Sequence, residues 1–221
     1  MRFAAETPNE KIRQKSLVRE YSEAIIIAVL LALFIRAFVV QAFKIPSGSM
    51  KTTLLVGDHI LVNKFIYGIK IPIINKELVH IKDPKRFDIV VFQYPVDPSK
   101  DFIKRVIGLP GDTVQIKDKQ VYVNDQPLDE PYTAFTDNKI LPAGVSPRDN
   151  FGPIVIPPGN LFVMGDNRDE SYDSRFWKFV DINDLKGEAF IIYWSWNQDG
   201  EMSTSSTDSY VRWNRLGKLL Q

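Results

Sequence analysis

The sequence has 221 residues, no cysteine, and 28 basic against 27 acidic side chains, for a formal net charge of +1. The lack of cysteine excludes disulfide frameworks, thiolate metal sites and a cysteine nucleophile. The balanced charge gives no reason to expect nucleic acid as a partner. Since 44% of the residues are hydrophobic, the chain can form a packed core of one large or two small domains.

The first 23 residues are polar and basic and are predicted to form a tail. Residues 24–43 follow with AIIIAVLLALFIRAFVVQAF, in which Arg36 and Gln41 are the only strongly polar side chains. As a helix, this stretch would match the hydrocarbon thickness of a bilayer, roughly 30 Å. A buried core helix and a cleavable signal peptide ending at Val40-Gln41-Ala42 are both open alternatives. We favour an uncleaved, single-pass membrane anchor.

Basic residues near the ends of an apolar segment set its orientation in the membrane. Two lysines lie between the segment and Ile60, namely Lys44 and Lys51. Five basic residues precede the segment: Arg2, Lys11, Arg13, Lys15 and Arg19. We therefore expect residues 1–23 to stay in the cytoplasm and residues 44–221 to lie outside.

Beyond the apolar segment, short alternating runs predict a chain that is mainly β. The strand candidates are residues 60–65, 87–92, 101–109, 113–116, 120–123, 160–164 and 188–196. The other segments are an edge strand or loop at 67–74, a loop at 138–158, a short helix at 181–186 and a low-complexity loop at 203–209. The spacing favours an antiparallel sheet or barrel over βαβ units.

Two serines at the end of the apolar segment, Ser47 and Ser49, lie on either side of Gly48. A serine held between a membrane exit and a strand is a candidate nucleophile, and it needs a base. The two histidines, His59 and His80, are better interpreted as surface residues. The chain contains no G-x-S-x-G, S-x-x-K, H-E-x-x-H or G-x-x-x-x-G-K-[ST] motif, which excludes the enzyme classes that those motifs identify.

A lysine base remains, and Lys104 stands out. In the strand candidate 101–109, successive side chains point to opposite faces, so Lys104 and Arg105 lie on different faces. If either face is packed, one cation is buried, and burial lowers the pKa of a lysine as a general base requires. The residues alone leave open a surface strand with two solvated cations.

A third stretch, residues 164–180, is dense in Asp, Asn, Ser and Arg directly after a strand candidate. Together with the serine and lysine stretches, it resembles the bacterial type I signal peptidases, which are membrane-bound Ser-Lys endopeptidases. Four blocks match in order: PSGSM followed by TLLVGDHILV, FDIVVFQYP, DFIKRVIGLPGD and GDNRDESYDSRFW. With the apolar segment they span residues 24–180. Two departures are Thr52, where proline is usual, and Lys178, where glycine is common.

The resemblance implies the catalytic roles. Ser49 would be the nucleophile and Lys104 the general base, and the Ser47 hydroxyl would form the oxyanion hole with the Ser49 backbone N–H. Ser171 would donate a hydrogen bond that orients Lys104. No metal or cofactor is implied.

The resemblance also implies support and specificity. Asp173 and Arg175 would form an ion pair that fixes the loop, and residues 166–168 would be structural. Shallow pockets for small substrate side chains would be lined by Ile45, Pro46, Met50, Leu54, Phe102 and Ile103. The substrate would add as a strand between residues 43–47 and the strand that carries Phe102.

The implied protein is a serine endopeptidase that removes N-terminal signal peptides from secreted preproteins after an Ala-x-Ala-like site. It would have an anchor at residues 24–43 in the bacterial inner membrane and an extracytoplasmic β-rich catalytic domain at 44–221. Residues 113–160 would form a smaller inserted β subdomain. Its partners would be preproteins and the lipid bilayer. Two other classes remain open: a self-cleaving Ser-Lys repressor and a noncatalytic anchored β-domain.

Overall fold

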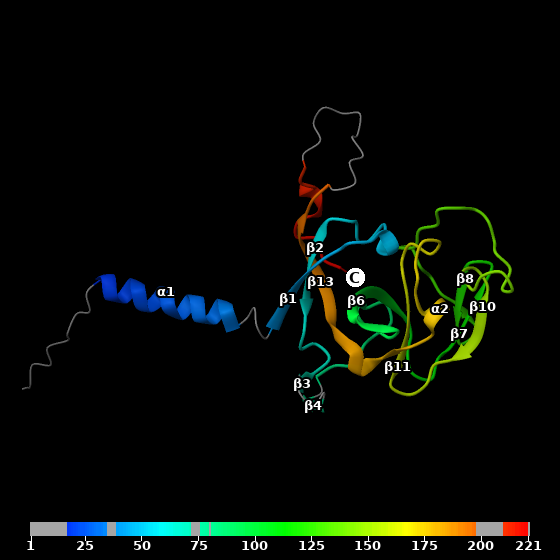
Figure 1. The fold of residues 1–221 in the computed structure, drawn as a ribbon, viewed down its shortest axis with the longest axis horizontal. Helices are drawn as coiled ribbons and strands as arrows, with labels where there is room; N and C mark the ends of the chain where they lie inside the picture. The colour runs from blue at the N-terminus through cyan, green and yellow to red at the C-terminus, as the bar shows by residue number, and fades with distance from the viewer. Residues whose placement is uncertain (1–16, 35–38, 72–75, 80, 198–209, 221) are drawn as a thin grey trace, which may run out of the picture. The chain divides into compact units, whose positions relative to one another are not determined.

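The computed structural model describes residues 17–34, 39–71, 76–79, 81–197 and 210–220 (Figure 1). The chain divides into two compact units, residues 1–37 and 38–221. Arg36, His80 and the loop predicted at 203–209 lie outside the described residues.

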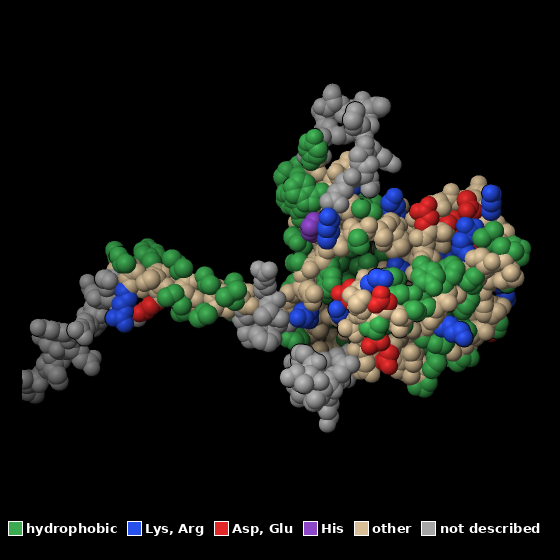
Figure 2. Space-filling model, viewed as in Figure 1, with side chains coloured by type: hydrophobic (Ala, Val, Ile, Leu, Met, Phe, Trp, Pro, Cys, Tyr) green, Lys and Arg blue, Asp and Glu red, His purple; other side chains and the backbone are tan. Residues whose placement is uncertain are grey.

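The first unit contains helix α1, Leu17–Phe34. Its large apolar side chains from Ile25 to Leu33 are exposed, and Figure 2 shows apolar side chains along the helix, with charged side chains near its N-terminal end. In the ranges that the structure describes, no helix combines the length and the apolar character needed to cross a membrane.

The predicted anchor at residues 24–43 is not a single helix. Helix α1 begins earlier and ends at Phe34, and Val40–Lys44 form strand β1. Strand β1 pairs antiparallel with β2, Asp58–Asn63. The prediction of helix through residue 43 is therefore wrong at its end. The two β-branched residues Val39 and Val40 favour an extended backbone, and β2 supplies the hydrogen-bond partners.

The second unit is built on a seven-stranded antiparallel sheet in the order β1-β2-β13-β5-β6-β11-β12 (Figure 1). Its other strands are β5 (Ile89–Tyr94), β6 (Asp97–Gly108), β11 (Asn160–Met164), β12 (Val180–Asp181) and β13 (Leu185–Ser195). The mainly antiparallel β core agrees with the fold class expected from the sequence.

Two smaller sheets complete this unit. Strands β10 (Phe151–Val155), β7 (Thr113–Lys117), β8 (Gln120–Val123) and β9 (Gln126–Pro127) form one, and β3 (Ile69–Ile71) and β4 (Lys76–Val79) form the other. The short helices are η2 (Gly48–Met50), α2 (Ser174–Trp177), η3 (Ile182–Asp184) and η4 (Trp213–Arg215). In Figure 1, β7, β8 and β10 lie on the opposite side of this unit from β1, β2 and β13.

Two local predictions differ from the structure, and one short helix was not predicted. Residues 138–158 contain strand β10 as well as loop, because Pro153 is accommodated at a bulge in an edge strand. The helix expected at 181–186 is the single 3-10 turn η3, and Leu185 already begins β13. Helix α2 was not predicted.

The core packs against both faces of the second half of β6. Val106 packs into one buried cluster with Val90, Phe92 and Leu161, whereas Ile107 packs into another with Val114. Since neighbouring residues point to opposite faces, the second half of β6 is packed on both sides. Lys104 and Arg105 are both buried, so the alternative of a surface strand with two solvated cations is wrong.

Candidate active site

A cleft of about 360 Å³ runs between residues 46–49 and residues 101–104 of strand β6. Glu170 and Tyr172, from the loop that follows β11, complete its lining. The sequence blocks that carry the two serines, the lysine and the polar loop therefore meet at one groove.

Ser49 lies in the short helix η2, directly after the extended residue Ser47. Its side chain is 8% exposed, and the neighbouring Met50 is fully buried in the core. The Ser47 side chain is exposed on the cleft and does not cap the helix. Burial of Met50 thus fixes the turn that presents Ser49 to the groove.

Lys104 is 4% exposed, and its Nζ lies 2.7 Å from Ser49 Oγ, within hydrogen-bonding distance. Nζ also donates to the Ile103 carbonyl oxygen at 2.9 Å. A neutral amine has one lone pair and can still donate, so these contacts fit an uncharged lysine that accepts the serine proton.

Burial lowers the pKa of Lys104 from 10.5 to about 8. The carboxylates of Asp173 and Asp166 oppose this change, and the Arg175 guanidinium adds to it. The lysine is thus partly uncharged near neutral pH, in line with the expectation drawn from its strand.

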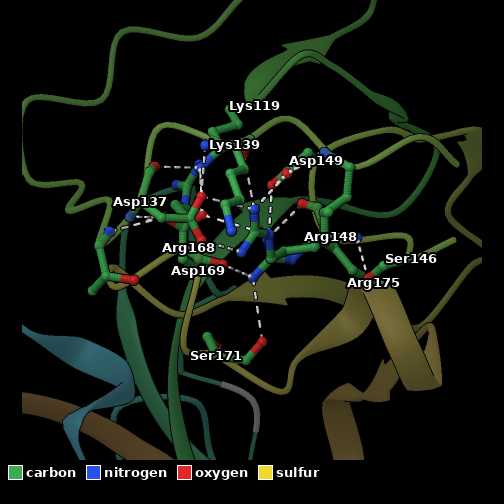
Figure 3. A network of polar contacts seen from close by, with 12 residues as sticks. Lys119, Asp137, Lys139, Ser146, Arg148, Asp149, Arg168, Asp169, Ser171 and Arg175 are labelled. Atoms are coloured by element: carbon green, nitrogen blue, oxygen red, sulfur yellow. Dashed lines mark hydrogen bonds and ion pairs between the residues drawn. The ribbon is translucent and has the colours of Figure 1, made fainter.

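Asp173 and Arg175 form the ion pair that the resemblance implied, with Nε of Arg175 2.8 Å from Oδ1 of Asp173. Burial raises the pKa of the Asp173 carboxyl, but Arg175 and the hydrogen bonds outweigh that effect, so the pKa lies below its ordinary value. Arg175 also donates to the carbonyl oxygens of Arg148 and Arg168, each at 2.7 Å. Figure 3 shows Arg175 as one member of the polar network that holds the loop.

Ser171 lies in the same loop and is buried. The hydrogen bond expected between Ser171 and Lys104 is absent among the described residues, and the Ser171 hydroxyl instead helps to lower the pKa of the Asp173 carboxyl. The loop nevertheless packs tightly here. A Cβ on Gly165 would collide with Ser171 Oγ and with the carbonyl oxygen of Ser49.

The predicted substrate-pocket residues separate into two groups. Pro46, Phe102 and Ile103 line the cleft. The other three are at most 1% exposed and belong to the core cluster beneath it: Ile45, Met50 and Leu54. Their apolar side chains anchor the turn that carries Ser49 from below, and their role in a substrate pocket stays a prediction. His59 packs against the Tyr193 ring and does not line the cleft.

The contacts of several supporting residues could not be predicted from the sequence, although residues 166–168 were expected to be structural. Arg105 pairs with Asp166 at 2.8 Å, and both side chains are 1% exposed. The backbone N–H of Asn167 donates to the Ser49 carbonyl oxygen at 3.1 Å. The order of the blocks suggests that these segments meet, but not which atoms touch.

The turn that follows η2 is held by residues far along the chain. The fully buried Asp58 accepts a hydrogen bond from Arg215 Nε at 3.0 Å and another from Ser195 Oγ at 2.6 Å. Its other carboxylate oxygen accepts from the Leu55 N–H at 2.8 Å, and Arg215 also donates to the Thr53 carbonyl oxygen at 2.9 Å. Residues 53–58 are thereby fixed to the segment that contains η4.

Comparison with known proteins identifies the family of this chain. The family model "Signal peptidase, peptidase S26" matches residues 18–194. The signal peptidase I of Pseudomonas aeruginosa is 40% identical over 91% of this chain and 81% of its own length. The signal peptidase I of Pseudomonas fluorescens is 37% identical over 85% of this chain and 76% of its own length. That of Bacillus amyloliquefaciens is 40% identical over 75% of this chain and 82% of its own length. The chain therefore belongs to the peptidase S26 family of signal peptidases and is a serine peptidase.

Proposed function

We propose that this peptidase removes N-terminal signal peptides from secreted preproteins, with Ser49 as nucleophile and Lys104 as general base. The observation that carries the proposal is the buried contact of 2.7 Å between Lys104 Nζ and Ser49 Oγ, at a lysine whose pKa is lowered to about 8. A base with a pKa near the working pH is both uncharged often enough and basic enough to take a proton.

Acylation begins when neutral Lys104 accepts the Ser49 hydroxyl proton as Oγ attacks the scissile carbonyl carbon. The negative charge that develops on the carbonyl oxygen is stabilised by the Ser49 backbone N–H and the Ser47 hydroxyl. Lys104 then passes its proton to the leaving amine. The mature protein departs, and the signal peptide remains as an ester on Ser49.

Deacylation repeats the same proton transfers with water. Lys104, neutral again, takes a proton from a water molecule that attacks the ester carbonyl. The proton then passes to Ser49 Oγ as the ester bond breaks, and the signal peptide leaves as a carboxylic acid. Ser171, Asp173 and Arg175 support the cycle by holding the loop against the lysine.

The substrate binds as an added β-strand. Within the described residues, β11 pairs with β6 only from Arg105 onward, while β5 pairs with the other edge along residues 101–104. One edge of these four residues is thus available to an extended peptide. Pro46, Phe102 and Ile103 leave only a shallow cleft, which favours cleavage after small side chains such as those of an Ala-x-Ala-like site.

The proposal includes a membrane location. Residues 24–35 are apolar, and their large side chains from Ile25 to Leu33 are exposed on α1, which suits contact with lipid. Anchoring the enzyme in the bacterial inner membrane, with its N-terminus in the cytoplasm, confines it to the plane that holds its substrates and raises their effective concentration. Protease added to sealed inverted vesicles should leave residues 45–221 intact, and digestion of that domain would refute the topology.

The central test is cleavage of a signal-peptide-bearing preprotein by the purified full-length chain in detergent. Ser49→Ala should abolish cleavage. The matched control Ser99→Ala, which removes an exposed hydroxyl from β6, should cleave normally. Replacing the small residue before the scissile bond with Phe should also stop cleavage. Unchanged cleavage by Ser49→Ala would refute the assignment of Ser49 as the nucleophile. If the chain only binds preproteins and does not cleave them, the Ser49→Ala variant should bind them as the parent does.

A further inference from the structure

Asn167 has no part in the proton transfers proposed above. It is nevertheless 1% exposed and donates hydrogen bonds to the carbonyl oxygens of Gly48 and Ser49, in the turn that carries the proposed nucleophile. We infer that Asn167 is a positioning residue that aims the Ser49 backbone N–H at the oxyanion. This inference rests on the proposed function, because it presumes that Ser49 is the nucleophile.

The contacts of Asn167 use each of its donors. Its backbone N–H donates to the Ser49 carbonyl oxygen at 3.1 Å. Its side-chain Nδ2 donates to the Gly48 carbonyl oxygen at 3.2 Å and to Glu170 Oε2 at 3.0 Å. An amide nitrogen carries two hydrogens, so both are used.

The contact with Gly48 controls Ser49 through peptide geometry. The Gly48 carbonyl and the Ser49 N–H belong to one planar trans peptide, so they point in opposite directions. The carbonyl oxygen also accepts from the Lys51 N–H at 3.0 Å. Asn167 Nδ2 and the Lys51 N–H thus occupy both lone pairs of the Gly48 carbonyl oxygen and fix its direction. Because the peptide is planar, the direction of the Ser49 N–H is fixed as well.

Glu170 sets the orientation of the Asn167 amide. A carboxylate only accepts hydrogen bonds, so it selects the NH₂ side of the amide and not the oxygen. Glu170 is exposed on the cleft and forms no ion pair with any residue in the described ranges, which leaves its carboxylate available for this contact. The nitrogen that Glu170 selects is the one that donates to Gly48.

The other side of the amide makes no hydrogen bond in the described structure. Asn167 Oδ1 is buried and has no hydrogen-bond partner among the described residues. An unsatisfied buried acceptor is destabilising, so the contribution of this amide lies in the two hydrogen bonds that Nδ2 donates, one of which holds the Gly48 carbonyl.

The test compares Asn167→Leu with Asn150→Leu, using the full-length protein in detergent and a fluorogenic signal-peptide substrate. Asn150 is the matched control, since its Nδ2 also donates to a carboxylate, that of Asp118, and to a carbonyl, that of Leu141. Asn167→Leu should lower kcat roughly 10-fold or more, short of the 10²–10³ expected when an oxyanion donor is lost outright. Its KM should change by less than about twofold, because the lost interaction acts only in the transition state. Asn150→Leu should keep both values.

A second measurement separates positioning from general damage. A peptide boronic acid ending in alanine forms a tetrahedral adduct on Ser49, and its affinity for Asn167→Leu should fall by the same factor as kcat. The affinity for the product peptide should not change. Equal losses for both ligands, or a kcat equal to that of Asn150→Leu, would overturn the inference.

Glu170→Ala provides an independent variant, because an exposed side chain can be removed without unfolding the loop. Its kcat should fall several-fold with KM unchanged, and this variant decides the question if Asn167→Leu does not fold. A wild-type kcat for Glu170→Ala in that case would refute the inference. Activity of Ser49→Ala in the same assay would instead refute the proposed function itself.

Discussion

Replacing Lys104 with Met separates the catalytic use of this residue from its effect on stability. Methionine is a long, unbranched side chain of similar length but carries no titrating group. The variant should be inactive, because the general base is gone. Its stability relative to the parent should depend strongly on pH, because burial lowers the pKa of Lys104 to about 8 from 10.5, the value for a lysine exposed to water.

The size of this effect follows from the two pKa values. At pH 7 and below, the lysine is protonated in both states, and folding bears the full penalty of about 3 kcal/mol at 1.36 kcal/mol per pKa unit. Between pH 8 and 10.5 the unfolded chain binds more protons, so the parent gains stability as pH rises. At pH 10 the remaining penalty is about 1 kcal/mol.

The free energy of unfolding of Lys104→Met relative to the parent should therefore decrease by about 2 kcal/mol between pH 7 and pH 10. Hydrogen bonds lost by the variant, to Ser49 Oγ and the Ile103 carbonyl, offset part of its advantage at every pH. Urea unfolding in detergent, followed by circular dichroism, measures the difference. The matched control is Lys100→Met, the same substitution at an exposed position of β6. A constant difference for Lys104→Met would mean that the lysine is not destabilised by burial, and the general-base assignment would fail.

Four further outcomes are expected. The initial rate at low substrate should rise about tenfold per pH unit below pH 7 and level off above pH 8, as Lys104 loses its proton, and a flat profile from pH 6 to 10 would contradict this. Ser47→Ala should lower kcat by roughly 10²–10³, and a wild-type rate would remove it from the oxyanion hole. Gly165→Ala should inactivate the enzyme in the cleavage assay, because its Cβ collides with the Ser49 carbonyl, and full activity would show that the loop can move aside. Lys178→Gly should raise the free energy of unfolding by about 1 kcal/mol and keep activity, because Lys178 has φ 74°, which glycine adopts without strain. Equal urea midpoints for the variant and the parent would show that the backbone at Lys178 is not strained.

The sequence is sufficient for features that depend on neighbours along the chain. The hairpin of β7 and β8 follows its alternating pattern, and its turn residues Asp118 and Lys119 adopt the positive φ values that a two-residue hairpin turn requires. The alternation in β6 correctly separates Lys104 from Arg105 onto two faces. Lys178 departs from the glycine common in the family at a position where the backbone does favour glycine.

The sequence does not predict side-chain contacts between segments that lie far apart along the chain. The sequence Ile45-Pro46 does not show which side chain points into the cleft and which into the core; in the structure Pro46 lines the cleft and Ile45 lies in the core. The amide of Asn167 and the carboxylate of Asp58 make their functional contacts across more than a hundred residues. No local pattern encodes such a contact, because the partner is chosen by the packing of the whole sheet.

The long separation between Asp58 and Arg215 has a consequence for biosynthesis. The two residues are 157 positions apart, so the turn that follows Ser49 is synthesised well before the side chain that clamps it. At about 5–20 residues per second, roughly 10–30 seconds of translation separate them. During that interval residues 53–58 lack this clamp, and Asp58 lacks the Arg215 guanidinium. The segment that follows Ser49 therefore reaches its final hydrogen-bonded arrangement only after Arg215 has been synthesised.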